Sequence, residues 1–241
     1  MAKAKSAPKS PAASKLPDIV TVKAVLLGIS ALLLNPATEA LLESLRTRVP
    51  LQRDRTRSRE EEAREKLLIN DQGQYYIPME YLLSSLIEAG RHVDFKPRTK
   101  ISTKLSTLLY SFLFGYPEQL VLTDGAGGKP EWRADFRRGC NPADGVMVAL
   151  VRPRFDNWGI EASFKVRTAR INPNKVREIF EISGSMIGLG DFRPACRGPF
   201  GCFEVSKWEL YGPDGELLSG EKVTATDGAT ETAEEAVAVP V

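Results

Sequence analysis

A stretch rich in glycine and arginine, residues 186–205 with the sequence MIGLGDFRPACRGPFGCFEV, constrains the fold of this chain more than any other segment. It holds four glycines, two arginines and two prolines, and it runs directly into an alternating apolar run. Glycine permits positive φ and lacks a Cβ, so such a loop can turn sharply and approach other atoms closely. The segment predicts a connection in front of a strand whose backbone can lie against an anion such as phosphate.

Apolar periodicity places strands and helices around this loop. Period-2 runs and short apolar runs predict strands at 18–30, 118–124, 145–155, 158–169 and 202–210. The two runs that flank Asp156-Asn157 predict a hairpin. Helical spacing predicts helices within 72–91 and 172–188, the second opened by Asn172-Pro173, and a short charged helix over 59–68.

The order of these elements is strand, helix, two strands, helix, strand. This is the split βαβ pattern, so we expect an α+β, ferredoxin-like (RRM-like) antiparallel sheet over residues 18–211. A long polar excursion at 35–75 is expected as an insertion after the first strand. The ends are biased in charge, with four lysines and no acid in the first sixteen residues and seven acids against one lysine from Asp214 onward. Residues 1–17 and 212–241 are therefore expected to be a basic and an acidic flexible tail.

Composition argues for a cytoplasmic protein with no membrane segment. The longest apolar run, 20–34, is interrupted by Lys23 and is shorter than a bilayer requires. The three cysteines, Cys140, Cys196 and Cys202, lack metal-ligand spacing and are expected to be reduced thiols. We expect neither a cofactor nor a bound metal.

The glycine-rich stretch offers groups that suit a nucleic acid. Arg193 and Arg197 carry planar donor forks that match phosphate oxygens, and the rings of Phe192 and Phe200 could stack on bases. The glycines expected to shape this loop are Gly188, Gly190, Gly198 and Gly201. On this hypothesis, valine at Gly190 or Gly201 impairs binding and leaves the fold intact. The alternative is a connection that needs glycines only for its bends.

Two further basic clusters could attract a polyanion without reading its sequence. The first lies in the excursion and comprises Arg46, Arg48, Arg53, Arg55, Arg57 and Arg59. The second, within 96–104, comprises Lys96, Arg98, Lys100 and Lys104. Arg152 and Arg154 follow apolar strand residues. A solvated and partly ion-paired surface is the alternative for each cluster.

The segment between the predicted helix and the last predicted strand, GLGDFRPACRGPFG, resembles the glycine-rich loop of the RAMP superfamily. The members of this superfamily are the ferredoxin-fold RNA-binding proteins of CRISPR systems. Pro199 and Phe200 between the last two glycines depart from the commonest form of that loop. The resemblance implies a backbone subunit that stacks with copies of itself along a guide RNA, beside other effector subunits. It also implies that the excursion acts as a thumb reaching the neighbouring subunit.

Three hypotheses for function stay open at this point. The leading one is a non-catalytic protein that coats single-stranded nucleic acid, with RNA favoured over DNA. The second is a metal-independent guide-RNA endoribonuclease, for which His92, the only histidine, is a weak candidate as general acid or base; Asp54 is a weaker candidate for target cleavage. The third is a viral or other assembly protein that uses the fold for protein contacts.

Overall fold

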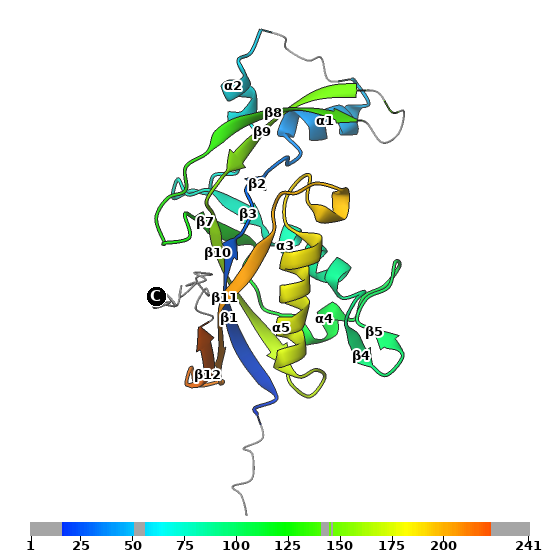
Figure 1. Ribbon diagram of the computed structural model, residues 1–241, viewed down its shortest axis with the longest axis vertical. Coiled ribbons are helices and arrows are strands. Elements are labelled where there is room, and N and C mark those ends of the chain that lie inside the picture. Colours follow the sequence, from blue (N-terminus) through cyan, green and yellow to red (C-terminus); the bar gives the residue numbers. More distant parts are fainter. Residues whose placement is uncertain (1–15, 51–55, 141–144, 146, 223–241) are drawn as a thin grey trace, which may run out of the picture.

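The computed structural model describes residues 16–50, 56–140, 145 and 147–222, and these form an α+β fold dominated by antiparallel strands (Figure 1). The larger sheet has the strand order β12-β11-β1-β10-β7-β3, and β6 also pairs with β10. Its strands are β1 (Ile19–Gly28), β3 (Tyr76–Pro78), β6 (Leu113–Phe114), β7 (Gln119–Thr123), β10 (Gly159–Arg167), β11 (Phe203–Tyr211) and β12 (Leu217–Lys222). The predicted α+β class with a mainly antiparallel sheet is confirmed.

Two helices, α3 (Met79–Ala89) and α5 (Pro173–Ile182), cover one face of this sheet (Figure 1). Every second residue of β1 and β10 is buried beneath them, because alternate side chains of a strand point to one face. Phe180 of α5 stacks on Phe164 of β10 at 5.0 Å between ring centroids, and it meets Trp208 edge-on at 5.4 Å. Each fully buried aromatic or aliphatic side chain of this kind contributes about 1.5–3 kcal/mol to folding.

The predicted second helix begins where the sequence indicates. The Asn172 side chain accepts a hydrogen bond from the Asn174 amide, and Pro173 occupies the first turn. The helix continues as a π-helical turn, η1 (Ser183–Ile187), which leads into the glycine-rich loop. The Ser183 hydroxyl hydrogen-bonds to that of Ser85 on α3 at 2.7 Å, so this turn is fixed to the neighbouring helix.

The predicted hairpin around Asp156-Asn157 is wrong. β9 (Met147–Phe155) pairs with β8 (Arg133–Cys140) and with β2 (Leu32–Leu33) in a second, three-stranded sheet, whereas β10 pairs with β1. Trp158 explains the change of sheet, because it is buried and its indole N–H donates to the Ser30 carbonyl at 2.8 Å. This anchor holds the chain at the junction between the two sheets.

The polar excursion and the β8–β9 hairpin form one structural unit at one end of the large sheet (Figure 1). α2 (Arg59–Arg64) lies on the hairpin, with Ala63 buried and the Lys66 ammonium donating to the Val151 carbonyl at 2.6 Å. α1 (Glu39–Thr47) has no buried residue. The remaining elements are β4 (Asp94–Lys96), β5 (Thr99–Lys100), α4 (Leu109–Phe112) and the 3-10 turn η2 (Pro194–Cys196).

The range predicted as an acidic tail, 212–241, begins with ordered structure. The Gly212 amide donates to the Glu216 carbonyl at 2.9 Å, and the turn returns the chain as β12, which pairs with β11. The short, mostly polar composition of this strand concealed it, since an edge strand with one open face needs few apolar residues. Residues 223–241 and 1–15 of the two predicted tails lie outside the described residues.

Candidate nucleic-acid interface

The glycine-rich loop crosses from η1 to β11 and packs on the segment between β1 and β2. The Gly201 amide donates to the Ala31 carbonyl at 2.9 Å, and the Asp191 amide donates to the Leu33 carbonyl at 2.8 Å. The amides of Gly188 and Gly198 donate to carbonyls of Ser183 and Arg193. These amides are satisfied within the protein. They are not directed at an anion, contrary to what the composition of the loop suggests.

The glycines of the loop are required by close packing. Gly188, Gly190 and Gly201 have φ of +77°, +73° and +73°. A Cβ added at Gly201 would lie inside van der Waals contact with the Leu189 carbonyl, and one at Gly198 would do so with the Phe192 carbonyl. These positions therefore favour the hypothesis that the glycines serve to bend the loop and to let backbone segments approach closely, over the hypothesis that they bind an anion.

A buried ion pair joins the loop to the β8–β9 hairpin. The Arg152 Nε atom lies 2.6 Å from Asp191 Oδ2, and the Arg152 side chain is only 9% exposed. The other oxygen of Asp191 accepts from the Phe192 amide at 2.8 Å. Because a buried charge is costly without its counter-charge, this pair fixes the loop against the hairpin.

Phe200 is a packing residue, so the expectation that it stacks on a base is not supported by its position. It is 6% exposed, and the guanidinium carbons of Arg137 and Arg154 lie 4.6 and 5.4 Å from its ring centroid. Phe192 lies 6.0 Å away at a tilted angle and is only half-buried. Phe192 is thus the ring of this loop that a ligand can reach, while Phe200 positions the two arginines.

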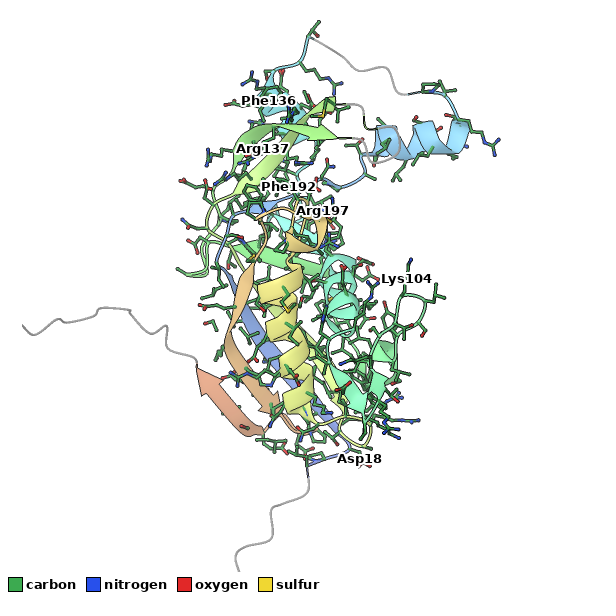
Figure 2. All side chains as sticks on the ribbon, turned by 45° about the vertical axis from the view of Figure 1, so that its right-hand side comes forward. Asp18, Lys104, Phe136, Arg137, Phe192 and Arg197 are labelled. Carbon is green, nitrogen blue, oxygen red and sulfur yellow. The ribbon has the colours of Figure 1, made fainter. Side chains whose placement is uncertain are left out.

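The loop and the hairpin enclose a cleft of about 670 Å³, here called the arginine cleft. Figure 2 shows Arg137 on the hairpin above Phe192 and Arg197 on the loop. The cleft is lined by Arg137, Arg138, Gly139, Met147, Leu150, Arg152, Asp191, Phe192, Cys196 and Arg197. Four arginines against one aspartate give it a strongly positive wall, and apolar groups lie between the charges.

The four arginines of the cleft differ in how far they are engaged within the protein. Arg152 pairs with Asp191, and Arg137 pairs with Asp135 at 2.7 Å. Arg138 and Arg197 are exposed and make no ion pair with any residue that the structure describes. The two exposed guanidinium groups are therefore available to an anionic ligand without cost to existing contacts.

Sequence reasoning identified Arg197 and noted Arg152, but it missed Arg137 and Arg138. Both lie in the run RADFRR at the start of β8, a segment for which periodicity predicts no element. Pairing of β8 with β9 places Arg137 opposite Leu150 and Arg138 opposite Ala149. No regular alternation marks this run, so the place of both arginines at the cleft becomes apparent only once that pairing is known.

The other loop arginine, Arg193, is partly engaged. One of its terminal nitrogens donates to the Gly190 carbonyl at 3.1 Å, and another lies 3.6 Å from a Glu88 oxygen. Its Nε atom is buried without a hydrogen-bond partner among the described residues. The two arginines predicted to act together in this loop therefore separate, with Arg197 facing the arginine cleft and Arg193 turned toward α3.

The arginines of the excursion are not gathered into one strip. Arg46 pairs with Glu43, Arg57 pairs with Glu65, and Arg59 lies 4.0 Å over the exposed Phe136 ring. Arg48 ends α1 in the left-handed conformation. Arg53, Arg55 and Asp54 lie outside the described residues. Where the structure describes them, these arginines are partly neutralised, which is the alternative expected for a charge run.

The second basic cluster belongs to another part of the surface. Arg98 and Lys100 lie at the β4–β5 hairpin, where Lys100 pairs with Asp94 at 2.9 Å, and Lys104 lies in the loop that follows. Figure 2 shows Lys104 away from Arg137 and Arg197. His92 is exposed just after α3, and the Lys100 ammonium donates to its carbonyl at 3.1 Å. The structure thus brings His92 near this cluster and not into the arginine cleft.

Two kinds of site are not found in the part of the chain that the structure describes. Within it, no group of three or more His, Cys, Asp or Glu side chains is placed to hold a metal ion. None of its helices has the length and apolarity needed to span a membrane. Cys196 and Cys202 are free thiols.

Comparison with known proteins gives a distant structural likeness. No family model matches the chain, and no curated protein matches it. Among solved structures, a chain of the "Cryo-EM structure of the Type III-B Cmr-beta bound to cognate target RNA" is similar at a TM-score of 0.41 and 11% sequence identity. The alignment covers 81% of this chain and 61% of that chain. This chain therefore spans less than two thirds of the length of the chain that it matches.

Proposed function

We propose that this protein binds single-stranded nucleic acid, and RNA in particular, along the arginine cleft. The observation that carries the proposal is the convergence of Arg137, Arg138 and Arg197 with the half-buried ring of Phe192. Guanidinium groups contact phosphates whatever the sequence, and an aromatic ring stacks on any base. Together they suit a flexible strand whose bases are accessible, as in single-stranded RNA.

The topology supports the finer proposal of a ferredoxin-like, RAMP-type fold. Taken in chain order, β1, β7, β10 and β11 are the four core strands, and they lie in the order 4-1-3-2 with α3 and α5 as the two helices. This order is the one that the split βαβ pattern produces. The glycine-rich loop before the last strand is the residue-level resemblance to that superfamily.

We propose a non-catalytic role, as a repeated backbone subunit that coats guide RNA within a larger ribonucleoprotein. The endoribonuclease alternative needs an acid or base beside the bound phosphates. His92 lies after α3 near the β4–β5 hairpin, whereas the cleft lies between β8–β9 and the glycine-rich loop. A binding role therefore fits the arrangement better than cleavage does.

Exposed apolar residues at α1 support self-association of the protein along the bound RNA. Leu42, Leu45 and Val49 are 53%, 67% and 63% exposed, and the helix buries none of its residues. An apolar helix face left open in this way is typical of a surface that meets another protein. We propose that it contacts the next copy of the chain on the same RNA.

Replacing both Leu42 and Leu45 with glutamate is expected to abolish cooperative coating and to leave single-site affinity within about twofold. The helix buries nothing, so the change costs little folding stability. Neighbour contacts raise the effective concentration of the next copy, so their loss flattens the binding curve on long RNA. The measurement compares a poly-U of several sites with a one-site oligonucleotide.

A matched control is Leu105→Glu, because Leu105 is 94% exposed on another surface. It should retain cooperative binding. Unchanged steepness in the α1 double variant would refute self-association through α1 and leave the RNA-binding proposal intact.

The RNA-binding proposal itself is tested with the full-length protein. We expect a fluorescein-labelled U-rich strand to bind with strong salt dependence, and a blunt duplex of equal length to bind more weakly because its bases are stacked. The salt slope should indicate several phosphate contacts, at about 0.7 per contact for a single strand. Absence of salt-dependent binding, together with an A260/A280 ratio typical of pure protein after nuclease-free purification, would favour the assembly-protein alternative.

A further inference from the structure

A second, smaller pocket lies beside the arginine cleft and shares one wall with it. It encloses about 320 Å³ and is lined by Asn35, Tyr81, Ser84, Gly190, Asp191 and Arg193. Asp191 lines both spaces, so the pocket and the arginine cleft are adjacent. A nucleobase is flat and small enough for such a volume, and its hydrogen-bonding edge can be read only in a space of this kind.

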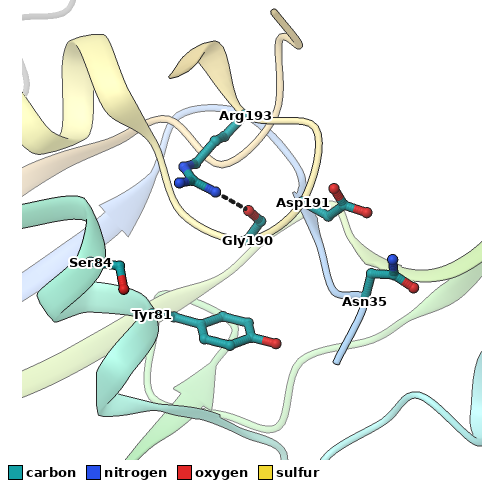
Figure 3. Close-up of a pocket in the computed structure, with 6 residues that line it drawn as sticks. All are labelled: Asn35, Tyr81, Ser84, Gly190, Asp191 and Arg193. Atoms are coloured by element: carbon teal, nitrogen blue, oxygen red, sulfur yellow. Dashed lines mark hydrogen bonds between the residues drawn. The ribbon is translucent and has the colours of Figure 1, made fainter. Parts of the chain in front are cut away.

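The polar groups of the pocket come from three separate segments. Figure 3 shows Tyr81 and Ser84 on α3 at one side, and Asn35 and Asp191 at the other, with Gly190 between them. Among the described residues, no hydrogen-bond partner is found for the side chains of Asn35, Tyr81 or Ser84. Asn35 and Ser84 are exposed and Tyr81 is half-buried, so all three can bond to a polar ligand in exchange for water.

The donors and acceptors of this pocket are mixed. Asp191 supplies a carboxylate, which only accepts hydrogen bonds; its Oδ2 atom is buried beside Arg152 Nε at 2.6 Å, and its Oδ1 atom accepts from the Phe192 amide. Arg193 supplies only donors; its Nε atom is buried, and its terminal nitrogens lie against the Gly190 carbonyl and Glu88. Asn35 and Tyr81 can do both. Burial raises the pKa of Tyr81, and the charge of Asp191 adds to this effect, so its hydroxyl stays protonated and able to donate at neutral pH.

Guanine is the base whose groups match this set most fully. Its N1–H and N2–H₂ are adjacent donors that a carboxylate or an amide oxygen can accept, and its O6 and N7 are acceptors suited to an arginine. Adenine and cytosine present no ring N–H on the Watson–Crick edge, and uracil presents one N–H without an adjacent amino group. A pocket with both a carboxylate and a guanidinium therefore discriminates in favour of guanine.

Resting on the proposed RNA-binding function, we infer that the pocket of Asn35, Tyr81 and Asp191 takes one guanine base of the bound strand. The protein would then prefer a guanine at one position of each site, while the arginine cleft holds the phosphates without regard to sequence. The preference belongs to this pocket alone and can be removed without changing the salt dependence of binding.

The test compares a U15 strand with the same strand carrying one central guanine, and with one carrying inosine, which lacks the N2 amino group. We expect the guanine strand to bind about tenfold more tightly than U15, a difference of about 1.4 kcal/mol, which one good base contact supplies, and we expect inosine to lose most of that gain. Tyr81→Phe and Asn35→Ala should each reduce the guanine preference severalfold while U15 affinity is unchanged. Neither side chain has an intramolecular partner among the described residues, so both variants should fold normally.

The matched control is Tyr110→Phe, which removes a phenol that is 52% exposed on α4. It should retain the full preference. Equal affinity of the wild-type protein for all three strands would overturn this inference and leave the proposed RNA binding in place. If no strand binds, the proposed function fails. A titration with GMP and UMP, followed by heteronuclear NMR, then tests separately whether the pocket takes guanine. Chemical-shift changes at Tyr81 that are specific to GMP support the inference, and equal or absent changes for the two nucleotides overturn it.

Discussion

Replacing Arg138 and Arg197 together with alanine is expected to weaken binding of a single strand by roughly 30-fold at low salt. Each exposed guanidinium that contacts a phosphate contributes about 1 kcal/mol, and the two act from opposite walls of the cleft. The loss should be similar for unrelated sequences, because phosphate contacts position a strand without reading it. The slope of log K against log salt should shrink by about 1.4, from about 0.7 for each lost contact.

The structure also selects the control for this experiment. Arg177 and Lys207 are cationic side chains on α5 and β11 that pair within their own elements with Glu181 and Glu209. Replacing them removes the same formal charge from surfaces outside the cleft, so affinity should change little. Equal losses in both double variants would mean that net charge alone, and not the arginine cleft, attracts the strand.

Much of the large sheet could be predicted because its strands and helices follow simple periodicities. The alternation in β1, the Asn172-Pro173 start of α5 and the apolar face of α3 each report a buried stripe directly. The pairing of β9 could not be predicted, since two adjacent alternating runs favour a hairpin on local grounds alone. The deciding contact joins Trp158 to Ser30, which are far apart in the sequence.

The candidate site was harder to predict than the fold for the same reason. Gly201 and Arg197 were found because they belong to one continuous stretch. Arg137 and Arg138 were not, because their place in the cleft depends on a hairpin that crosses from a different part of the chain. Composition also does not distinguish a glycine that frees its amide for an anion from one that packs on a carbonyl, and the hydrogen bond from Gly201 to Ala31 is of the second kind.

Gly201→Ala is expected to destabilise the fold by about 3 kcal/mol or more, in place of the selective loss of binding that the sequence suggests for substitution at this position. The added Cβ would overlap the Leu189 carbonyl, a backbone atom that cannot swing aside. Relief would require Gly201 to move away from Leu189, whose amide donates to the Gly201 carbonyl, and would disturb the bond from the Gly201 amide to the Ala31 carbonyl. For a domain of this size, such a loss lowers the melting temperature by roughly 6–12 °C.

The free-energy cost of the left-handed backbone and the cost of the steric overlap can be measured separately, by making the same substitution at a second glycine with the same φ. Gly73 has the same φ of +73°, and a Cβ there would have nothing within 4 Å. Gly73→Ala therefore carries only the cost of a left-handed alanine, about 1–2 kcal/mol, and the excess cost at Gly201 measures the overlap. Thermal and urea unfolding followed by circular dichroism give both values. If the two variants are equally stable, the loop tolerates a side chain at Gly201, and close packing on Leu189 does not explain the need for glycine. If Gly201→Ala is fully stable but binds RNA more weakly, Gly201 contributes to the ligand site.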